Sequence, residues 1–209
     1  MEFKAAADES SHRCSVLPDP HFAPLKEVLS ERLQQVAARI TPENFGSFLD
    51  PLMRDVFQQG LTEAAAHEGT LWLLDQTEEN LVPAYNTGPN AKRFVGSFRQ
   101  PLDQGLISMV FASEQPFVEN EVYKNARQSR HLDSLLGIQT QGLIAVPFYF
   151  LKRCRGVASC VQTLVPESRS APSPGFTHAH LAAVHRAVGI LRRLLEYGLI
   201  ARTVCWETD

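Results

Sequence analysis

One run of residues restricts the possible fold more than any other part of the sequence. Residues 142–151, GLIAVPFYFL, form a continuous apolar stretch rich in β-branched and aromatic side chains. Such a stretch is typical of a strand that is covered on both faces. Residues 152–155 are polar and residues 156–164 are apolar again. We therefore predict a hairpin whose first strand is central in a sheet.

Helical periodicity is found at both ends of the chain, and short strands and helices are expected between them. The predicted helices cover residues 25–40, 41–60 with a break at Pro51, 105–114, 131–138 and a last segment that begins at Thr177. Further predicted strands cover residues 70–74, 81–86, 97–102 and 116–119. This order of elements indicates an α+β fold, an antiparallel sheet covered by helices.

Length and composition favour one packed domain. Of 209 residues, 44% are hydrophobic and 21% are charged, close to the averages of globular proteins. We expect a tail at residues 1–24, a domain with flanking helices at 25–203 and a second tail at 204–209.

Charge and hydropathy limit the partners of the chain. The net charge of −3 gives no basic field to attract nucleic acid or an anionic membrane. No apolar run approaches the roughly 20 residues that span a bilayer, and the first 15 residues lack the apolar centre of a signal peptide. We therefore expect a cytoplasmic protein that contacts neither nucleic acid nor membrane.

The four cysteines, at positions 14, 154, 160 and 205, match no zinc-binding spacing. If Cys154 and Cys160 lie on one extended strand, their Cα atoms are roughly 20 Å apart, too far for a disulfide. A thiol enzyme needs an activated thiolate and a resolving partner within reach. We therefore predict that the chain is not an enzyme.

Several local sequences, taken in order, resemble the GAF domain family. PLDQGLISMV at residues 101–110 is similar to the family's entry into a helix, and GLIAVPF at 142–148 is similar to one of its strands. The other similar segments are residues 64–75, 113–118, 155–158 and 176–181, and together the six cover about residues 45–200.

This resemblance implies a six-stranded antiparallel sheet with helices packed on one face and a pocket beneath loops on the other. It also implies that the N- and C-terminal helices form a bundle. Family members bind cyclic nucleotides, tetrapyrroles, haem, metals or metabolites, or they bind nothing and act as dimerisation units. The motifs of the cyclic-nucleotide and covalent-bilin branches are incomplete in this sequence, so the resemblance names no ligand or cofactor.

The resemblance places a candidate ligand site in the loop segment over the sheet, which also contains Asn125 and Asp133. Arg127 and Arg130 could clamp a phosphate or carboxylate there. Solvated loop residues and plain core residues are the alternatives, and a lone His131 does not predict a metal site. The candidate ligand-binding residues are Phe98, Asn120, Tyr123, Arg127, Arg130, His131, Phe148 and Cys160.

The two terminal helices carry apolar stripes with the rhythm of a coiled-coil seam, which indicates a homodimer. The alternative is packing on the chain's own sheet. The candidate interface residues are Leu29, Leu33, Val36, Leu181, Val184, Val188, Leu191 and Leu195.

We therefore expect a regulatory or sensory GAF domain that binds a small ligand and relays the signal through its terminal helices. The alternative is a ligand-free scaffold for homodimerisation or protein contact. No output segment follows the last predicted helix, so either the output protein is separate or the module stands alone.

Overall fold

A computed structural model describes residues 20–164 and 173–204 of the chain. Its centre is a six-stranded sheet in the order β3-β2-β1-β6-β5-β4, and every neighbouring pair is antiparallel. The strands are β1 (Glu68–Leu74), β2 (Asn80–Asn86), β3 (Gln100–Pro101), β4 (Phe117–Glu119), β5 (Gln139–Phe150) and β6 (Arg153–Leu164). The predicted six-stranded antiparallel α+β fold is confirmed.

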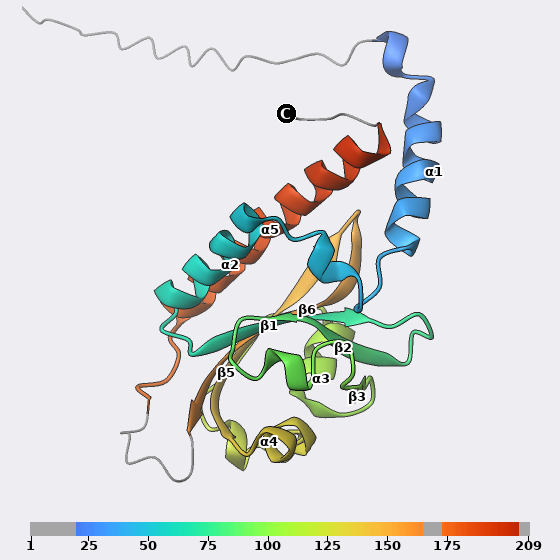
Figure 1. The fold of residues 1–209 in the computed structure, drawn as a ribbon. Helices are drawn as coiled ribbons and strands as arrows, with labels where there is room; N and C mark the ends of the chain where they lie inside the picture. Colours follow the sequence, from blue (N-terminus) through green and yellow to red (C-terminus); the bar gives the residue numbers. More distant parts are fainter. Residues whose placement is uncertain (1–19, 165–172, 205–209) are drawn as a thin grey trace, which may run out of the picture.

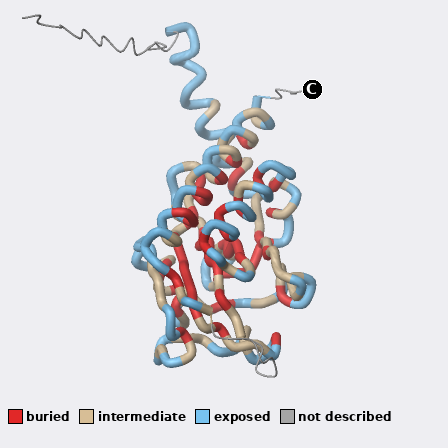
Figure 2. Tube along the Cα trace, turned by 90° about the vertical axis from the view of Figure 1, so that its left-hand side faces the viewer, coloured by how far each residue is buried: buried red, intermediate tan, exposed pale blue. Residues whose placement is uncertain are grey.

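The long helices α2 (Pro51–Glu63) and α5 (His178–Thr203) lie together over one face of the sheet (Figure 1). Helix α1 (Leu25–Ala38) contacts α5 and projects away from the sheet, and most of its residues are exposed (Figure 2). No helix in the described part of the chain is long and apolar enough to cross a membrane.

Shorter segments border the opposite face of the sheet (Figure 1). Helix α3 (Gly105–Ser113) packs against β5 and β6, and helix α4 (His131–Leu136) lies beside β5. The described residues also include four single-turn 3-10 helices, namely η1 (Pro20–Phe22), η2 (Phe45–Ser47), η3 (Ala91–Arg93) and η4 (Val122–Lys124).

Side-chain caps set the starts of the two long helices. The Asp50 carboxylate accepts a hydrogen bond from the Met53 backbone N–H at 2.8 Å, and Pro51 occupies the first turn. The predicted helix over residues 41–60 is therefore divided, as the break at Pro51 indicates. Thr177 caps α5, and His180 completes a capping box.

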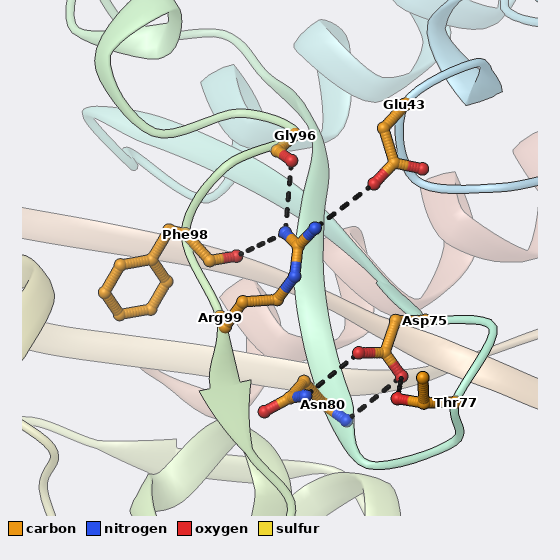
Figure 3. Close-up of polar contacts among 7 residues, drawn as sticks. All are labelled: Glu43, Asp75, Thr77, Asn80, Gly96, Phe98 and Arg99. Carbon is orange, nitrogen blue, oxygen red and sulfur yellow. Dashed lines mark hydrogen bonds and ion pairs between the residues drawn. The ribbon is translucent and has the colours of Figure 1, made fainter.

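Two predictions about the strands need correction. The strand expected at residues 97–102 is reduced to β3, because Arg99 turns toward the carbonyls of Gly96 and Phe98 before the pairing starts (Figure 3). Strand β5 is not central. It lies next to the edge and gains its burial from helices on both faces, whereas β1 and β6 occupy the centre.

The turn between β1 and β2 is closed by Asp75 (Figure 3). Its carboxylate accepts hydrogen bonds from the Thr77 hydroxyl and the Asn80 amide, each at 2.9 Å. Burial acts to raise the pKa of Asp75, but the hydrogen bonds from Asn80 and Thr77 outweigh it and hold the pKa below its ordinary value. The turn therefore helps to keep β1 and β2 in register.

Candidate ligand-binding cavity

The alternation of side chains along the strands gives the sheet two different faces. On β1, Leu71 and Leu73 point toward α2 and α5, and Trp72 belongs to a second apolar cluster on the opposite face. On β6, Ala158 and Cys160 belong to the helix-covered face. We call the face under α2 and α5 the helix face, and the face bordered by α3 and α4 the cavity face.

The cavity face contains a partly open cavity of about 70 Å³ between the sheet, α3 and α4. Such a volume holds roughly five to seven water-sized groups, enough for a small ligand. Its polar lining residues are Glu68, Thr70, Asn86, Gln100, Gln128, Ser129, Asp133, Thr140 and Ser159. Its other lining residues are Trp72, Phe94, Gly105, Leu106, Ile107, Leu132, Leu136, Ile138, Leu143 and Val161.

Buried polar side chains concentrate at this cavity. Seven polar side chains of the described chain are buried, and five of them line it. A buried polar group costs free energy unless it finds a partner, and each of the five has a hydrogen-bond partner within the described chain. The five are Thr70, Asn86, Gln100, Thr140 and Ser159.

Hydrogen bonds hold the floor of the cavity in place. The indole N–H of Trp72 donates to the Ser159 hydroxyl at 2.9 Å, which ties β1 to β6. The Asn86 amide donates to the Thr70 hydroxyl oxygen at 2.9 Å, and its oxygen accepts from the Gly88 N–H at 2.7 Å. The floor is therefore preorganised across three neighbouring strands.

Asp133 and Thr140 form the wall contributed by α4 and the start of β5. One oxygen of the Asp133 carboxylate accepts from the Thr140 hydroxyl at 2.7 Å, and the other accepts from the Thr140 backbone N–H at 2.9 Å. Both oxygens of this carboxylate thus have a donor from the protein.

Glu68 differs from Asp133. Its Oε2 atom is buried, and no residue in the described part of the chain hydrogen-bonds to it. The carboxylate packs against Gly88, where a side chain would collide with it. The Oε2 atom of Glu68 is therefore a buried acceptor that the described residues leave unsatisfied, although the residue as a whole is partly exposed.

The structure places the eight candidate ligand residues outside this cavity. Phe148 and Cys160 are fully buried on the helix face, because they alternate with the residues that face the cavity. Phe98 lies close by, with its ring edge-on to Trp72 at 6.2 Å, but it does not line the cavity. Asn120 bonds the backbone of Phe176 through both amide atoms and so fixes the approach to α5.

The loop residues among the candidates flank the cavity wall instead of facing inward. Arg127 reaches the Met109 sulfur at 3.4 Å, and Arg130 donates to the Tyr123 carbonyl at 2.9 Å. His131 is exposed at the start of α4. Gln128 and Ser129, between the two arginines, are the residues that line the cavity. The predicted segment borders this cavity, and the side chains of it that line the cavity are not those of the candidate residues.

The candidate interface residues differ in how far they are buried within the chain itself. Val184, Val188, Leu191 and Leu195 are buried against the chain's own sheet and helices. Leu29, Leu33, Val36 and Leu181 are partly buried. Packing on the chain's own sheet, the alternative considered above, accounts for the first four.

The cavity residues that sequence reasoning missed carry a signal in their spacing. Glu68, Thr70 and Trp72 share one face of an otherwise apolar strand, and Ser159 interrupts a run of small apolar residues. Polar residues at every second position of a buried strand indicate a face that is not plain core. In the described part of the chain, no cluster of three His, Cys, Asp or Glu suits a metal ion.

No family model matches the chain, and no curated protein matches it in sequence. Solved structures are similar in fold. The GAF domain of a phosphoenolpyruvate-protein phosphotransferase from Coxiella burnetii superposes with a TM-score of 0.56 at 20% identity, covering 86% of this chain and 95% of that one.

Two further structures show the range of proteins that share the fold. The free methionine-R-sulfoxide reductase from Neisseria meningitidis, in complex with its substrate, gives a TM-score of 0.52 at 18% identity, with 91% of this chain and 97% of that chain covered. Residues 122 to 287 of a methyl-accepting chemotaxis protein superpose with a TM-score of 0.52 at 16% sequence identity. This match covers 87% of this chain and 99% of that chain. The chain therefore has a GAF-like fold, and its function must be argued from the site.

Proposed function

We propose that this chain, which has the fold of GAF domains, is a regulatory or sensory domain that binds a small ligand in the cavity face. Binding is passed through the terminal helices to a second copy or to a separate signalling protein. We place this activity in the cytoplasm.

The observation that carries the proposal is the cavity with its preorganised polar floor. Trp72, Ser159, Thr70 and Asn86 are held by hydrogen bonds to one another, so a ligand meets fixed partners. Preorganised partners reduce the ordering cost of binding. Apolar side chains from α3 and α4 form the opposite wall and would give a ligand apolar contacts.

A contact path leads from the cavity wall to the N-terminal helices. Phe94 and Gln100 line the cavity at the two ends of one loop. Arg99, within this loop, pairs with Glu43 at 3.4 Å in the linker between α1 and α2 (Figure 3). Such an exposed pair contributes at most about 1 kcal/mol, so it favours one arrangement of the linker without locking it. A ligand that moves this loop would therefore shift the linker.

The terminal helices also offer a surface for the partner. Leu25 and Val28 of α1 are exposed, as are Tyr197 and Ile200 of α5. Apolar side chains of this size on two adjoining helices suit a protein contact. A homodimer through this surface is part of the proposal, and it uses different residues of α5 from the buried ones predicted above.

Binding, not catalysis, is the proposed role. Within the described residues, no cysteine lines the cavity. Burial raises the pKa of the Cys160 thiol to about 12, and Cys160 lies on the helix face. A thiol reaction in the cavity would need a reactive thiolate at that place.

A ligand-free scaffold is the second candidate, and the exposed apolar surface of α1 and α5 favours it. The two functions differ in what the cavity does. A scaffold would assemble equally well after the cavity is filled by a side chain, whereas a ligand sensor would lose its ligand.

Native mass spectrometry of the purified protein, with an absorption spectrum of the same sample, tests the proposal. We expect a dimer that carries added mass. The variant Leu143→Phe projects a ring into the cavity and should lose that mass. Leu135→Phe makes the same change on the exposed side of α4 and should keep it. A bare protein, or added mass that survives in Leu143→Phe, would contradict a ligand site in this cavity.

A further inference from the structure

One edge of the sheet is only partly covered by a partner strand. The outermost strand, β4, pairs with β5 at residues 143–145. Strand β5 continues over residues 146–150, which pair with β6 on their other side. In the described part of the chain, no strand pairs with the outer edge of these residues. Unpaired N–H and C=O groups along such an edge form a template for a further strand.

The residues of this edge decide which backbone groups it offers. Pro147 lies opposite Val157 of β6 and has no N–H, which a strand tolerates where the proline nitrogen points away from its paired neighbour. The register irregularity nearby inserts its extra residue, Arg155, into β6, so β5 itself stays regular. The C=O of Pro147 and the N–H and C=O of Tyr149, two residues further on, therefore point to the open edge.

An open groove of about 510 Å³, which we call the edge groove, lies between this edge and helix α5. Pro147 and Tyr149 line it from β5, and both are partly exposed. Because Phe148 and Phe150 turn into the core of the helix face, Pro147 and Tyr149 reach the groove along the edge of the strand. The residues that line it from α5 are His185, Arg186, Val188, Gly189, Ile190, Arg192 and Arg193.

The edge groove is basic, although the whole chain carries a net charge of −3. Arg186 is paired with Glu63 at 2.7 Å. Within the described residues, no carboxylate forms an ion pair with Arg192 or Arg193. Arg192 is partly exposed as a whole, but its Nε atom is buried and has no acceptor among the described residues. Two guanidinium groups are therefore open to an anionic partner.

Two further carboxylates near the edge groove already have donors. Glu196, one turn beyond Arg192 on α5, accepts a hydrogen bond from the Leu151 N–H at 2.9 Å. Glu114 accepts one from the Tyr149 hydroxyl at 2.6 Å. The groove thus combines open cationic side chains with an open strand edge, and a polypeptide can use both because its backbone continues the sheet. A nucleic acid could use only the charge.

We propose that the edge groove binds an extended acidic segment of a partner protein as an additional antiparallel strand on β5. Residues directly opposite each other in an antiparallel pair share a face. Side chains opposite Pro147 and Tyr149 would therefore point away from α5, and the alternate side chains would point toward Arg192 and Arg193. The partner segment is expected to carry acidic residues at these alternate positions. This inference goes beyond the ligand cavity and does not depend on it.

A second copy of this chain suits the edge less well than a partner segment. The missing N–H of Pro147 leaves an edge that accepts more hydrogen bonds than it donates, and two identical edges of this kind do not complement each other fully. A separate acidic segment can supply both the missing donors and the carboxylates.

A labelled peptide with blocked ends, Thr-Glu-Val-Glu-Val-Glu-Thr, tests the proposal by fluorescence anisotropy with the full-length protein. Versions with Gln or Lys in place of Glu test the charge. N-methylation of both valines removes the N–H groups that would face β5 and keeps the charge. N-methylation of two glutamates, whose N–H groups would face solvent, is the matched control.

We expect saturable binding of the acidic peptide and at least about tenfold weaker binding of the Gln and Lys versions. N-methylation of the valines should abolish binding, and N-methylation of the glutamates should not. The double variant Arg192→Gln/Arg193→Gln should weaken binding by about tenfold. Arg32→Gln/Arg39→Gln removes the same charge at exposed positions in and beside α1 and should leave binding unchanged.

Hydrogen exchange of single amides reads the added strand directly. The unpaired N–H of Tyr149 should exchange rapidly in the free protein and become at least about tenfold slower with the acidic peptide. The N–H of Ile144, within the paired part of β5, should be protected in both states.

Three results would overturn the proposal. No saturable binding of the acidic peptide would remove it outright. Binding that survives N-methylation of the valines, is displaced by oligothymidylate and leaves Tyr149 unprotected would show a face for polyanions in general. Protection of Tyr149 that rises with the concentration of the protein alone would show that a second copy occupies the edge.

Discussion

The two faces of the sheet are built from alternate residues of the same strands, yet they differ in kind. The helix face carries closely packed apolar side chains such as Phe148, Phe150 and Leu71, covered by α2 and α5. The cavity face carries Thr70 and Ser159 at neighbouring positions, covered by shorter helices. The difference indicates that the helix face supplies stability, while the cavity face is the one to which we assign the proposed ligand.

The contrast between the faces also explains how one small domain can combine a stable core with a polar cavity. Large aromatic and aliphatic side chains on the helix face contribute most of the buried apolar area. This allows the cavity face to keep polar groups and a cavity that cost stability. Substitutions on the two faces should therefore have different consequences.

The largest effect is expected on the helix face, from Phe148→Ala. Phe148 is fully buried and packs edge-on against Phe45 at a ring distance of 6.1 Å. Its truncation should lower the free energy of unfolding by about 3–5 kcal/mol, measured by urea denaturation. Phe22→Ala, on an exposed ring, is the control and should change it by less than about 0.5 kcal/mol. If Phe148→Ala left stability intact and removed the ligand, Phe148 would belong to the site and not to the core.

Smaller changes in stability are expected when two helical glycines are replaced by alanine, and the two changes should have opposite signs. Gly60 of α2 lies against Ala187 of α5 so closely that an added methyl group would collide with it, whereas the space around Gly189 is open. Gly60→Ala should destabilise the protein by about 1–3 kcal/mol because it forces the two helices apart. Gly189→Ala should stabilise it by about 0.5–1 kcal/mol through helix propensity. Equal thermal shifts of one sign would show that α2 and α5 are not packed this closely.

The smallest effect is expected at Cys160, whose thiol should resist alkylation in the folded protein. With a pKa of about 12, only about one thiol in 10,000 is ionised at pH 8. Iodoacetamide at pH 8 should leave Cys160 unmodified in the folded protein and alkylate it in urea, as measured by peptide mass spectrometry. Rapid alkylation of the folded protein would place a reactive thiol within reach of solvent and would revive the possibility of a thiol enzyme.

Much of the fold could be predicted from the sequence because local signals agreed with the final packing. Asp50-Pro51 and Thr177 mark helix starts by capping chemistry, which acts within a few residues. The strands of the main hairpin were recognisable from their apolar runs. The position of β5 beside the edge was not predictable, because strand order depends on contacts between distant segments.

The sequence indicated a segment that borders the cavity, but not which of its side chains line it. The loop around residues 125–133 does form one wall, and Asp133 lines the cavity. Arg127 and Arg130 were favoured for their charge, but which side chains of a loop face inward depends on its tertiary packing. For Phe148 and Cys160 the strand alternation was available, since they share a face with Ile144 and Ala158 and not with Leu143 and Ser159.

The most direct test of the difference between the faces is a pair of substitutions at adjacent residues of β5. Leu143 faces the cavity, and Ile144 is fully buried on the helix face. We measure the free energy of unfolding of Leu143→Phe and Ile144→Phe by urea denaturation. We expect Leu143→Phe to lower the free energy of unfolding by less than about 1 kcal/mol, because the cavity accepts the ring. Ile144→Phe should lower it by about 1–3 kcal/mol or more through overpacking. Equal losses at the two positions would contradict this difference, since they would mean that the two faces are packed alike.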